Sequence, residues 1–468
     1  MRPHRISPEG MWKVTDCACS KTVVPSVDVA ALKSRILAHE AVVGVIGLGY
    51  VGLPLVKAFC ARGYRVIGFD VDMTKVDKLE RGETYIRHLP GAEFKDLIGR
   101  GLFAPTADYA RLREVDAVLI CVPTPLTRHR EPDLSYIVAT GEAITPYLRP
   151  GHVISLESTT YPGTTREVLQ PILERSGLKS GVDFFVAFSP EREDPGNPKY
   201  ETTTIPKVVG ADDPVALDLA SALYREVVNA VVPVSSAATA EAVKLTENIF
   251  RSVNIALVNE LKIVYGAMGI DVWEVIDAAK TKPFGFMPFY PGPGLGGHCI
   301  PIDPFYLTWK AREYDIVTRF IELAGEINTA MPLHVIRRLA ESLDRFFGRG
   351  LNGAKILVLG IAYKKNVDDM RESPSLRILE MLRERGSLVE YYDPFVPEVM
   401  PTREHPTLTG MKSIAWSPAA LGAFDAVLIA TDHDAVDYEA VVAGSRLVID
   451  TRNATARVTT GRERVVKA

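Results

Sequence analysis

The sequence contains little cysteine and no long apolar run, and each shortage excludes a class of protein. Five cysteines in 468 residues, an odd number without regular spacing, do not form a disulfide framework and are typical of a reducing compartment. No apolar stretch reaches the roughly 18 residues that a membrane-spanning helix needs. The amino terminus also lacks the apolar core of a secretory signal. We therefore expect a cytoplasmic protein without a membrane partner.

A large excess of charge is missing as well. The net charge of −4 argues against a nucleic-acid partner held through its phosphates. The chain is 47% hydrophobic and 24% charged and has no low-complexity run, which is the composition of a globular protein. A chain of 468 residues is too long for one ordinary core, so two or three domains are expected.

The first recognisable motif is a βαβ unit between Ala41 and Asp70. Three glycines form G-x-G-x-x-G between an apolar strand and a helix. The first glycine makes a tight turn, the second lets the backbone approach a pyrophosphate, and the third packs helix on strand. The free N–H groups of the helix attract the phosphates. The cofactor-binding residues expected here are Gly47, Leu48, Gly49, Tyr50, Val51 and Gly52.

Asp70 indicates which dinucleotide binds. It closes the second strand 18 residues past Gly52, where a carboxylate accepts hydrogen bonds from both ribose hydroxyls. A 2′-phosphate would be repelled there, so NAD is predicted rather than NADP. Lys75 is within reach of the adenosine side, although a solvated charge on a helix is an equal alternative.

A second series of strands begins at Ala354 and resembles the first. The pentapeptide DAVLI occurs at residues 116–120 and again at 425–429, each time where a later parallel strand is expected, which indicates an old duplication. The second series lacks the complete glycine set, because Gly360 is followed by Ala362 and Lys364. This half is therefore expected to bind something other than a dinucleotide.

Positive charge collects after the first strand of this second series. The end of the sheet where ligands bind carries Lys364, Lys365 and Arg371. A diphosphate is the ligand expected at this positive charge. The alternative is a solvated basic loop, partly neutralised by Asp368 and Asp369.

The predicted fold class is α/β, with two Rossmann-like doubly wound parallel-sheet domains joined by a long central helical region. Residues 237–270 are apolar around most of a helix, which must be buried between domains or against a second copy. Residues 318–347 form another helical segment with a start or kink at Pro332. The predicted divisions are an extension with a short helix capped by Ser26 (1–40), an NAD domain (41–235), a central dimerisation domain (236–350) and a UDP domain (351–468).

Two clusters carry potential chemistry. Glu241, Lys244 and Asn248 share one face of the central helix, where Lys244 needs either a function or an ion pair with Glu241. The loop PGPGLGGHCIPIDPFY delivers Cys299 and then Asp303 beside a helix start, where a thiolate is favoured. Alternatively, Cys299 is a small buried apolar group and Asp303 a helix cap. The substrate-site residues expected in this loop and just before it are Tyr290, Gly292, Gly294 and Gly296.

These parts suit the oxidation of an alcohol to an acid, which removes two hydrides. An aldehyde does not readily donate the second hydride, whereas a thiohemiacetal formed with Cys299 does and becomes a thioester that water releases. Lys244 and Asn248 would stabilise the tetrahedral oxygens, and Asp303 would take protons and position water. No metal is required.

The chain resembles the UDP-sugar 6-dehydrogenases, which include UDP-glucose and UDP-N-acetylhexosamine dehydrogenases. The resemblance covers about residues 27 to 455. It rests on GLGYVGLP, CVPTP, ESTTYPGTT, SPERE, the Glu241–Lys244–Asn248 helix, GLGGHCIPIDP and GIAYKKNVDDMRESP. It implies NAD as cofactor, a UDP-sugar substrate, two NAD reduced per sugar, and a homodimer or dimer-based oligomer formed through the central helix.

The resemblance also implies roles for single residues. Cys299 matches the nucleophile, Asp303 its acid–base neighbour, and Lys244 and Asn248 the oxyanion donors. The other matches are Thr159 to a threonine that holds water near the nicotinamide, Glu191 to a carboxylate of thioester hydrolysis, Lys364 to a UDP-sugar contact, Arg371 to a cofactor contact, and Thr124 to the turn of the cofactor pocket.

Departures from the UDP-glucose enzymes bear on the substrate. Pro195 replaces a second glutamate, Ile302 replaces a lysine, and no arginine precedes the glycine loop in TKPFGFMPFYPGPG. The loop sequences are more similar to enzymes for N-acetylated sugars, which favours UDP-N-acetylglucosamine. UDP-N-acetylmannosamine, UDP-N-acetylgalactosamine and UDP-glucose stay as alternatives. More remote alternatives are a two-electron β-hydroxyacid dehydrogenase and a non-catalytic nucleotide-sugar sensor.

Overall fold

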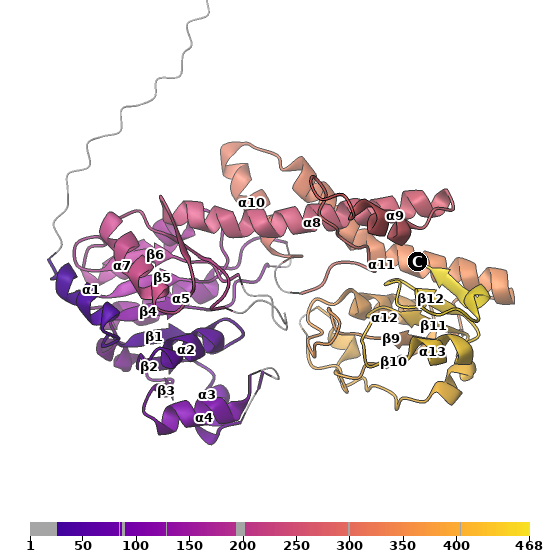
Figure 1. The fold of residues 1–468 in the computed structure, drawn as a ribbon, viewed down its shortest axis with the longest axis horizontal. Helices are drawn as coiled ribbons and strands as arrows, with labels where there is room; N and C mark the ends of the chain where they lie inside the picture. Colours follow the sequence, from indigo (N-terminus) through magenta and orange to yellow (C-terminus); the bar gives the residue numbers. More distant parts are fainter. Residues whose placement is uncertain are drawn as a thin grey trace, which may run out of the picture.

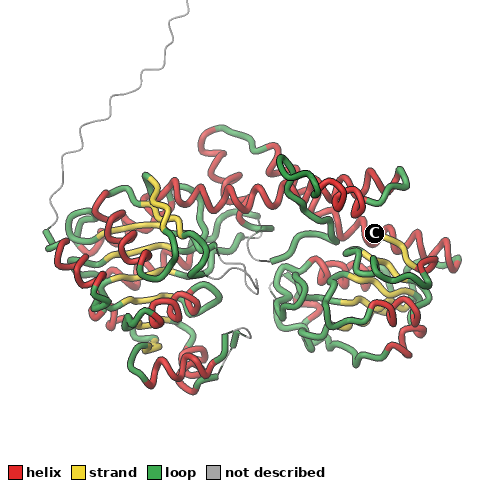
Figure 2. Tube along the Cα trace, in the orientation of Figure 1, coloured by secondary structure: helices red, strands yellow, loops and turns green. Residues whose placement is uncertain are grey.

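Two α/β lobes joined by long helices make up the described part of the protein (Figures 1 and 2). The computed structural model describes residues 26–83, 85–86, 89–127, 129–192, 202–297, 300–402 and 404–468. In these ranges the chain forms one sheet of eight strands and one of five. The predicted fold class is confirmed.

The first sheet has the order β3-β2-β1-β4-β5-β6-β7-β8. Its neighbours run parallel except β6 and β7, which are antiparallel. The strands are β1 (Val43–Ile46), β2 (Val66–Phe69), β3 (Phe103–Thr106), β4 (Ala117–Ile120), β5 (Val153–Leu156), β6 (Phe185–Phe188), β7 (Lys207–Gly210) and β8 (Val231–Val234). The strand order reverses between β1 and β4, and sheets of this kind bind ligands beyond the carboxyl ends of the strands at such a point.

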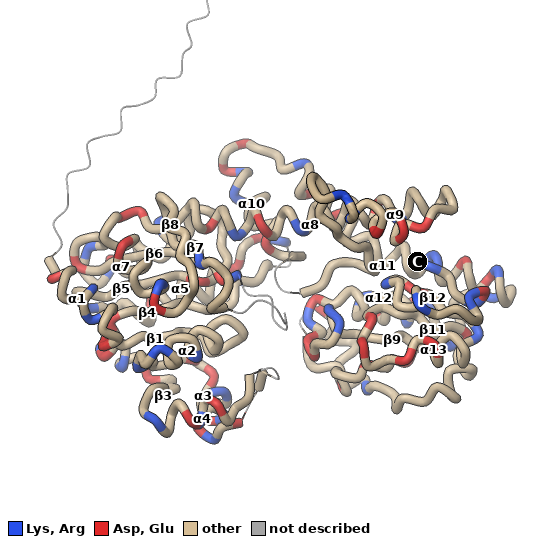
Figure 3. The backbone as a smooth tube through the Cα atoms, viewed as in Figure 1, with Lys and Arg blue, Asp and Glu red and all other residues tan. Residues whose placement is uncertain are grey.

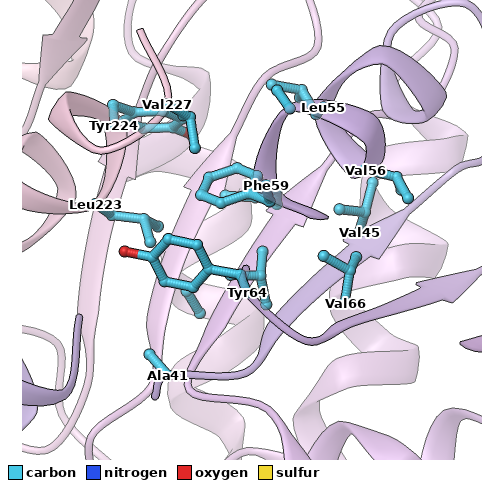
Figure 4. Packing of buried hydrophobic residues seen from close by; sticks show 14 of the residues in the cluster. Ala41, Val45, Leu55, Val56, Phe59, Tyr64, Val66, Leu223, Tyr224 and Val227 are labelled. Carbon is cyan, nitrogen blue, oxygen red and sulfur yellow. The ribbon is translucent and has the colours of Figure 1, made fainter. Parts of the chain in front are cut away.

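Helices cover both faces of this sheet, and Figure 4 shows Phe59 and Tyr64 packed within one of these layers. The helices are α1 (Val29–Leu37), α2 (Gly52–Ala61), α3 (Met73–Arg81), α4 (Gly91–Gly99), α5 (Ser135–Ile144), α6 (Gln170–Leu173) and α7 (Pro214–Arg225). The prediction that Ser26 caps the first helix is wrong, because Asp28 accepts the hydrogen bond from Ala31. Ser26 instead bonds to Val182 and Asp183, which tie the chain to the sheet.

The central helices bridge the two lobes. α8 (Ala237–Ala267) crosses from the first lobe to the second and packs along α11 (Arg319–Phe347), with α9 (Val272–Ala279) and α10 (Asp303–Ala311) beside them (Figure 1). Asn259 donates to Asn328 across the α8–α11 contact over 2.9 Å. Pro332 lies inside α11 without ending the helix.

The second sheet repeats the core of the first, with the order β10-β9-β11-β12-β13 and all pairs parallel. The elements are β9 (Lys355–Leu359), α12 (Pro374–Glu384), β10 (Leu388–Tyr392), β11 (Ala426–Ile429), α13 (Tyr438–Gly444), β12 (Val448–Asp450) and β13 (Val465–Lys467). The repeated DAVLI segments form β4 and β11, each paired with the first strand of its sheet. Asp116 and Asp425, which open the two segments, accept equivalent N–H groups from Val42 and Lys355.

Charges of both signs are interspersed over the two lobes (Figure 3). None of the helices in the described ranges combines the length and the apolar character needed to cross a membrane.

Candidate active site between the two sheets

The glycine turn after β1 has three different environments. Gly47 has a φ of +93°, and a side chain there would meet the carbonyl of Cys121 at 2.6 Å. A side chain at Gly52 would meet the carbonyl of Gly47 at 1.9 Å. A side chain at Gly49 would meet nothing within 4 Å, so its backbone borders open space. The turn is therefore tight where the protein packs and open where a pyrophosphate would approach.

Asp70 lies directly after β2 with 5% of its surface exposed. One carboxylate oxygen accepts the N–H of Leu48 at 3.0 Å and contacts the ammonium of Lys75 at 3.0 Å. The ion pair fixes Lys75 on the acidic residue rather than leaving it a solvated helix charge. The open backbone at Gly49 and the fixed carboxylate at Asp70 fit NAD.

Tyr50 and Arg371 connect the glycine turn to the second lobe. The guanidinium carbon of Arg371 lies 4.8 Å from the centre of the Tyr50 ring, a cation–π contact between the two lobes. Asp369 holds Arg371 through two hydrogen bonds of 2.8 and 2.9 Å. Burial, followed by the charge of Asp369, raises the pKa of Tyr50. Arg371 therefore lies beside the predicted cofactor turn, although it belongs to the second lobe.

Lys244, Asn248 and Asp303 meet where α8 packs against α10. Each has less than a tenth of its surface exposed, and the Asn248 amide donates to Asp303 over 2.5 Å. Burial raises the pKa of Asp303 to about 7, against the charge of Lys244 and the hydrogen bond from Asn248. A carboxyl group that titrates near neutral pH in a buried polar cluster is suited to proton transfer.

Glu241, one turn earlier on α8, has a different set of partners. Its carboxylate accepts the N–H groups of Gly163 at 2.5 Å and Thr165 at 2.9 Å, and the Thr165 hydroxyl at 2.7 Å. The alternative in which Glu241 pairs with Lys244 is therefore wrong, since its hydrogen bonds hold the loop that follows β5. Lys244 instead interacts electrostatically with Asp303.

Two further contacts hold the loops after β4 and β5 to each other and to α10. Ser158, next to the half-buried Thr159, donates to the carbonyl of Val122 over 2.7 Å. Tyr306 on α10 donates to the carbonyls of Thr124 and Pro125 at 3.0 and 3.2 Å. The loops that carry Thr124 and Thr159 are thus anchored together beneath α10. Tyr306 was missed by the sequence analysis, because an aromatic residue in a helix indicates only packing.

Glu191 follows β6 at the same end of the sheet. One of its carboxylate oxygens accepts the N–H of Arg192 at 2.6 Å, and the other lies 3.5 Å from the ammonium of Lys207. The Lys207 side chain is only 4% exposed. The buried ammonium group of Lys207 therefore lies next to the Glu191 carboxylate.

The glycine loop lies against the second lobe. Gly292 donates to Asn259 on α8 over 3.0 Å. Added side chains at Gly294 and Gly296 would meet Pro374 and Tyr363, both at 2.8 Å. Tyr363 immediately precedes Lys364, so the loop and the predicted diphosphate site are adjacent. Their tight packing explains why side chains are excluded from these two positions.

Tyr290 has a different environment from the glycines. Its ring stacks on Trp273 of α9 with centroids 5.4 Å apart, and its hydroxyl donates to Asp277 over 3.2 Å.

Part of the predicted basic loop is neutralised, since the ammonium group of Lys365 lies 2.7 Å from the carboxylate of Asp434.

Arg452 is a potential ligand-binding residue that the sequence analysis missed. It follows β12, and a side chain at Gly292 would lie 2.5 Å from one of its terminal nitrogens. Its Nε donates to the carbonyl of Ala430 over 3.2 Å, which orients the guanidinium toward the loop. An arginine directly after a predicted parallel strand, as in RLVIDTRN, was the available signal. His298 and Cys299 lie outside the described residues, as does Pro195.

Comparisons with known proteins match all three parts of the chain. The family models for the NAD-binding, central and UDP-binding domains of the UDP-glucose/GDP-mannose dehydrogenase family match residues 41–228, 238–330 and 357–457, respectively. The UDP-N-acetyl-D-glucosamine 6-dehydrogenase of Pseudomonas aeruginosa is 36% identical, with 84% of this chain and 90% of the relative covered. The UDP-N-acetyl-D-mannosamine dehydrogenase of Pyrococcus horikoshii is also 36% identical, with 88% and 95% covered.

A solved structure agrees with the sequence relatives. The UDP-N-acetylmannosamine dehydrogenase structure from Pyrococcus horikoshii has a TM-score of 0.81 and 33% identity, and covers 91% of this chain and 98% of its own. Together with the cofactor turn, these matches define an NAD-dependent oxidoreductase of UDP-sugars. The chain belongs to the UDP-glucose/GDP-mannose dehydrogenase family.

Proposed function

We propose that the chain oxidises the C6 alcohol of a UDP-N-acetylhexosamine to the carboxylate, with UDP-N-acetylglucosamine as the favoured substrate and Cys299 as the covalent catalyst. The observation that carries the proposal is the buried group of Lys244, Asn248 and Asp303. Asp303 lies four residues after Cys299 in the sequence and has a pKa suited to moving protons near neutrality.

The residues of the cluster have complementary roles in this route. NAD, when bound, supplies the hydride acceptor for both oxidation steps. Asp303 accepts the alcohol proton as the first hydride leaves C6, which gives the aldehyde, and Lys244 and Asn248 donate to the oxygen on C6. The Cys299 thiolate then adds to the aldehyde carbon, and loss of a second hydride from C6 leaves a thioester. Glu191 takes a proton from the water that replaces the sulfur, while Thr159 holds that water.

The remaining site residues hold the two ligands. The turn at residues 47–52 and Asp70 bind NAD, with Thr124 and Arg371 at the edge of its pocket. Lys364 and Arg452 supply positive charge for the diphosphate, and the glycines at 292, 294 and 296 allow the backbone to close on the substrate. The substrate role of Tyr290 stays a prediction, since its hydroxyl bonds to Asp277.

Measuring NADH against a panel of UDP-sugars tests the function. We expect two NADH per sugar and the highest kcat/KM with UDP-N-acetylglucosamine, compared with the N-acetylmannosamine, N-acetylgalactosamine and glucose nucleotides. The Cys299→Ala variant should form no uronic acid. One NADH per substrate would instead indicate a two-electron β-hydroxyacid dehydrogenase, and no NADH with any UDP-sugar would indicate a binding protein.

We also propose that two copies associate through the central helices. α8 exposes apolar side chains that a single chain leaves in contact with water, including Leu257 and Ile263, which are 51% and 43% exposed. Next to them lies a groove of about 440 Å³, lined by Glu260, Ile263, Leu323, Ile327, Ala330, Met331, Leu333, His334 and Arg337. A groove with apolar walls on a long helix is typical of an interface between subunits.

A further inference from the structure

A buried lysine lies between two glutamates at the end of the first sheet where β5 and β6 finish. Lys207 is the first residue of β7, which runs antiparallel to β6 with Phe188 opposite Gly210. Continuing that register sets Lys207 opposite Glu191, the residue proposed for hydrolysis. The Lys207 ammonium lies 2.5 Å from Glu157 and 3.5 Å from Glu191. The ammonium group of Lys207 therefore contacts both carboxylates.

Glu157 fixes the position of this cation. It follows β5 with its side chain fully buried, and accepts hydrogen bonds from the hydroxyl of Tyr224 and the ammonium of Lys207. Burial opposes the charge of Lys207, but the two carboxylates raise the pKa of Lys207 above its ordinary value, so the lysine stays protonated. A buried ion pair contributes little net stability compared with apolar residues, so its presence here calls for another explanation.

We propose that Lys207 is a positioning residue, held by Glu157, that keeps the Glu191 carboxylate oriented for hydrolysis of the thioester. Arg192 donates its N–H to one oxygen and Lys207 contacts the other, so both contacts restrict the orientation of the carboxylate. The inference rests on the proposed function, because it assigns Lys207 to the last step of that route.

The step that depends on Lys207 consumes one water molecule. Glu191 removes a proton from the water, the oxygen forms a bond to C6, and the C6–sulfur bond breaks to release the Cys299 thiolate. The acid then ionises, and the proton on Glu191 passes to solvent. No oxidant is used in this step, so both hydrides have already left.

The test separates hydride transfer from hydrolysis. Lys207→Gln should slow steady-state turnover by about 10- to 100-fold, less than the loss of a general base itself. The KM values for NAD and the UDP-sugar should change little. A rapid-mixing experiment should show a burst of two NADH per site, and intact-protein mass spectrometry after acid quench should show the sugar attached to the protein.

A second variant guards against misfolding, because Lys207→Gln leaves Glu157 buried without its cation. Glu157→Gln/Lys207→Gln removes both charges, and should fold while keeping the burst and the attached sugar. Lys310→Gln is the matched control, since Lys310 is also a little-exposed lysine between two glutamates, Glu167 and Glu313, but does not contact Glu191. The control should show no burst.

The possible failures are distinguishable. If the double variant folds and hydrolyses as fast as the wild type, the role of Lys207 is wrong while the covalent route stands. If the wild type releases one NADH per sugar, or Cys299→Ala still forms the acid, the covalent route itself is wrong.

Discussion

At the residue scale, opposing effects act on the pKa of the Asp303 carboxyl group. Only 3% of the residue is exposed, and burial raises its pKa to about 7 from 3.8 despite the nearby Lys244 and the hydrogen bond from Asn248. The folded state therefore favours the protonated form. The stability that this form contributes is fully present below pH 3.8 and is lost as the pH rises through about 7. By linkage, this loss amounts to at most roughly 4 kcal/mol.

The same titration should govern turnover. As a proton acceptor, Asp303 must be ionised, so kcat/KM of the wild type should rise with pH and level off above about 7. Asp303→Asn should lose this limb and about 10²- to 10⁴-fold of the rate. Initial rates of NADH formation between pH 5.5 and 9 (roughly two units either side of the titration) measure both effects. A limb that persists in Asp303→Asn assigns the titration to another group.

At the element scale, the turn between β1 and α2 separates folding from cofactor binding. Gly52→Ala places a methyl group 1.9 Å from the Gly47 carbonyl, so α2 must shift, and we expect a loss of about 1–3 kcal/mol of stability. Gly49→Ala meets no atom within 4 Å, so the protein should fold normally and show a raised KM for NAD. Thermal unfolding and NAD titration measure the two effects. Equal melting temperatures for the two variants would contradict the assignment of Gly52 to packing and of Gly49 to cofactor binding.

The elements also show what could be predicted from the sequence. The glycine turn, Asp70 and the Lys244–Asn248 face were predictable, because each depends on residues close together along one strand or helix. The partner of Glu241 was not predictable in the same way. Gly163 and Thr165 lie about eighty residues away from Glu241, so only the packing of α8 on the sheet brings them together. The roles of Tyr306 and Arg452 depend on similar long-range contacts.

At the scale of the whole molecule, the two sheets have kept one arrangement but differ at one carboxylate. Asp393 is the counterpart of Asp70, since it follows the second strand and accepts the N–H after the first glycine, that of Ile361. In the second sheet, His433 also contacts Asp393 at 3.0 Å and is fully buried. The position that would hold a ribose is therefore occupied by the protein itself. This explains why the incomplete glycine set of the second sheet accompanies a different ligand.

The predicted association is also a property of the whole molecule. The central helix was expected to be buried on most sides, yet within one chain Leu257 and Ile263 are exposed. A second copy of the chain packed on α8 would cover these side chains and so account for the apolar sequence of the helix. The predicted division between domains stays a prediction, but the exposed face belongs to α8 and α11 wherever that division falls.

Ile263→Glu tests the association because it places a charge on the apolar groove. A dimer carries the change twice, and burying one such side chain is worth about 1.5–3 kcal/mol, so the dimer should weaken about 10²- to 10⁴-fold. Light scattering after size exclusion should give twice 51.4 kDa for the wild type and a monomer for the variant. Leu388→Glu, on an exposed position of β10, is the control and should stay dimeric. If the wild type is a monomer at micromolar concentration, the proposed association through α8 is wrong.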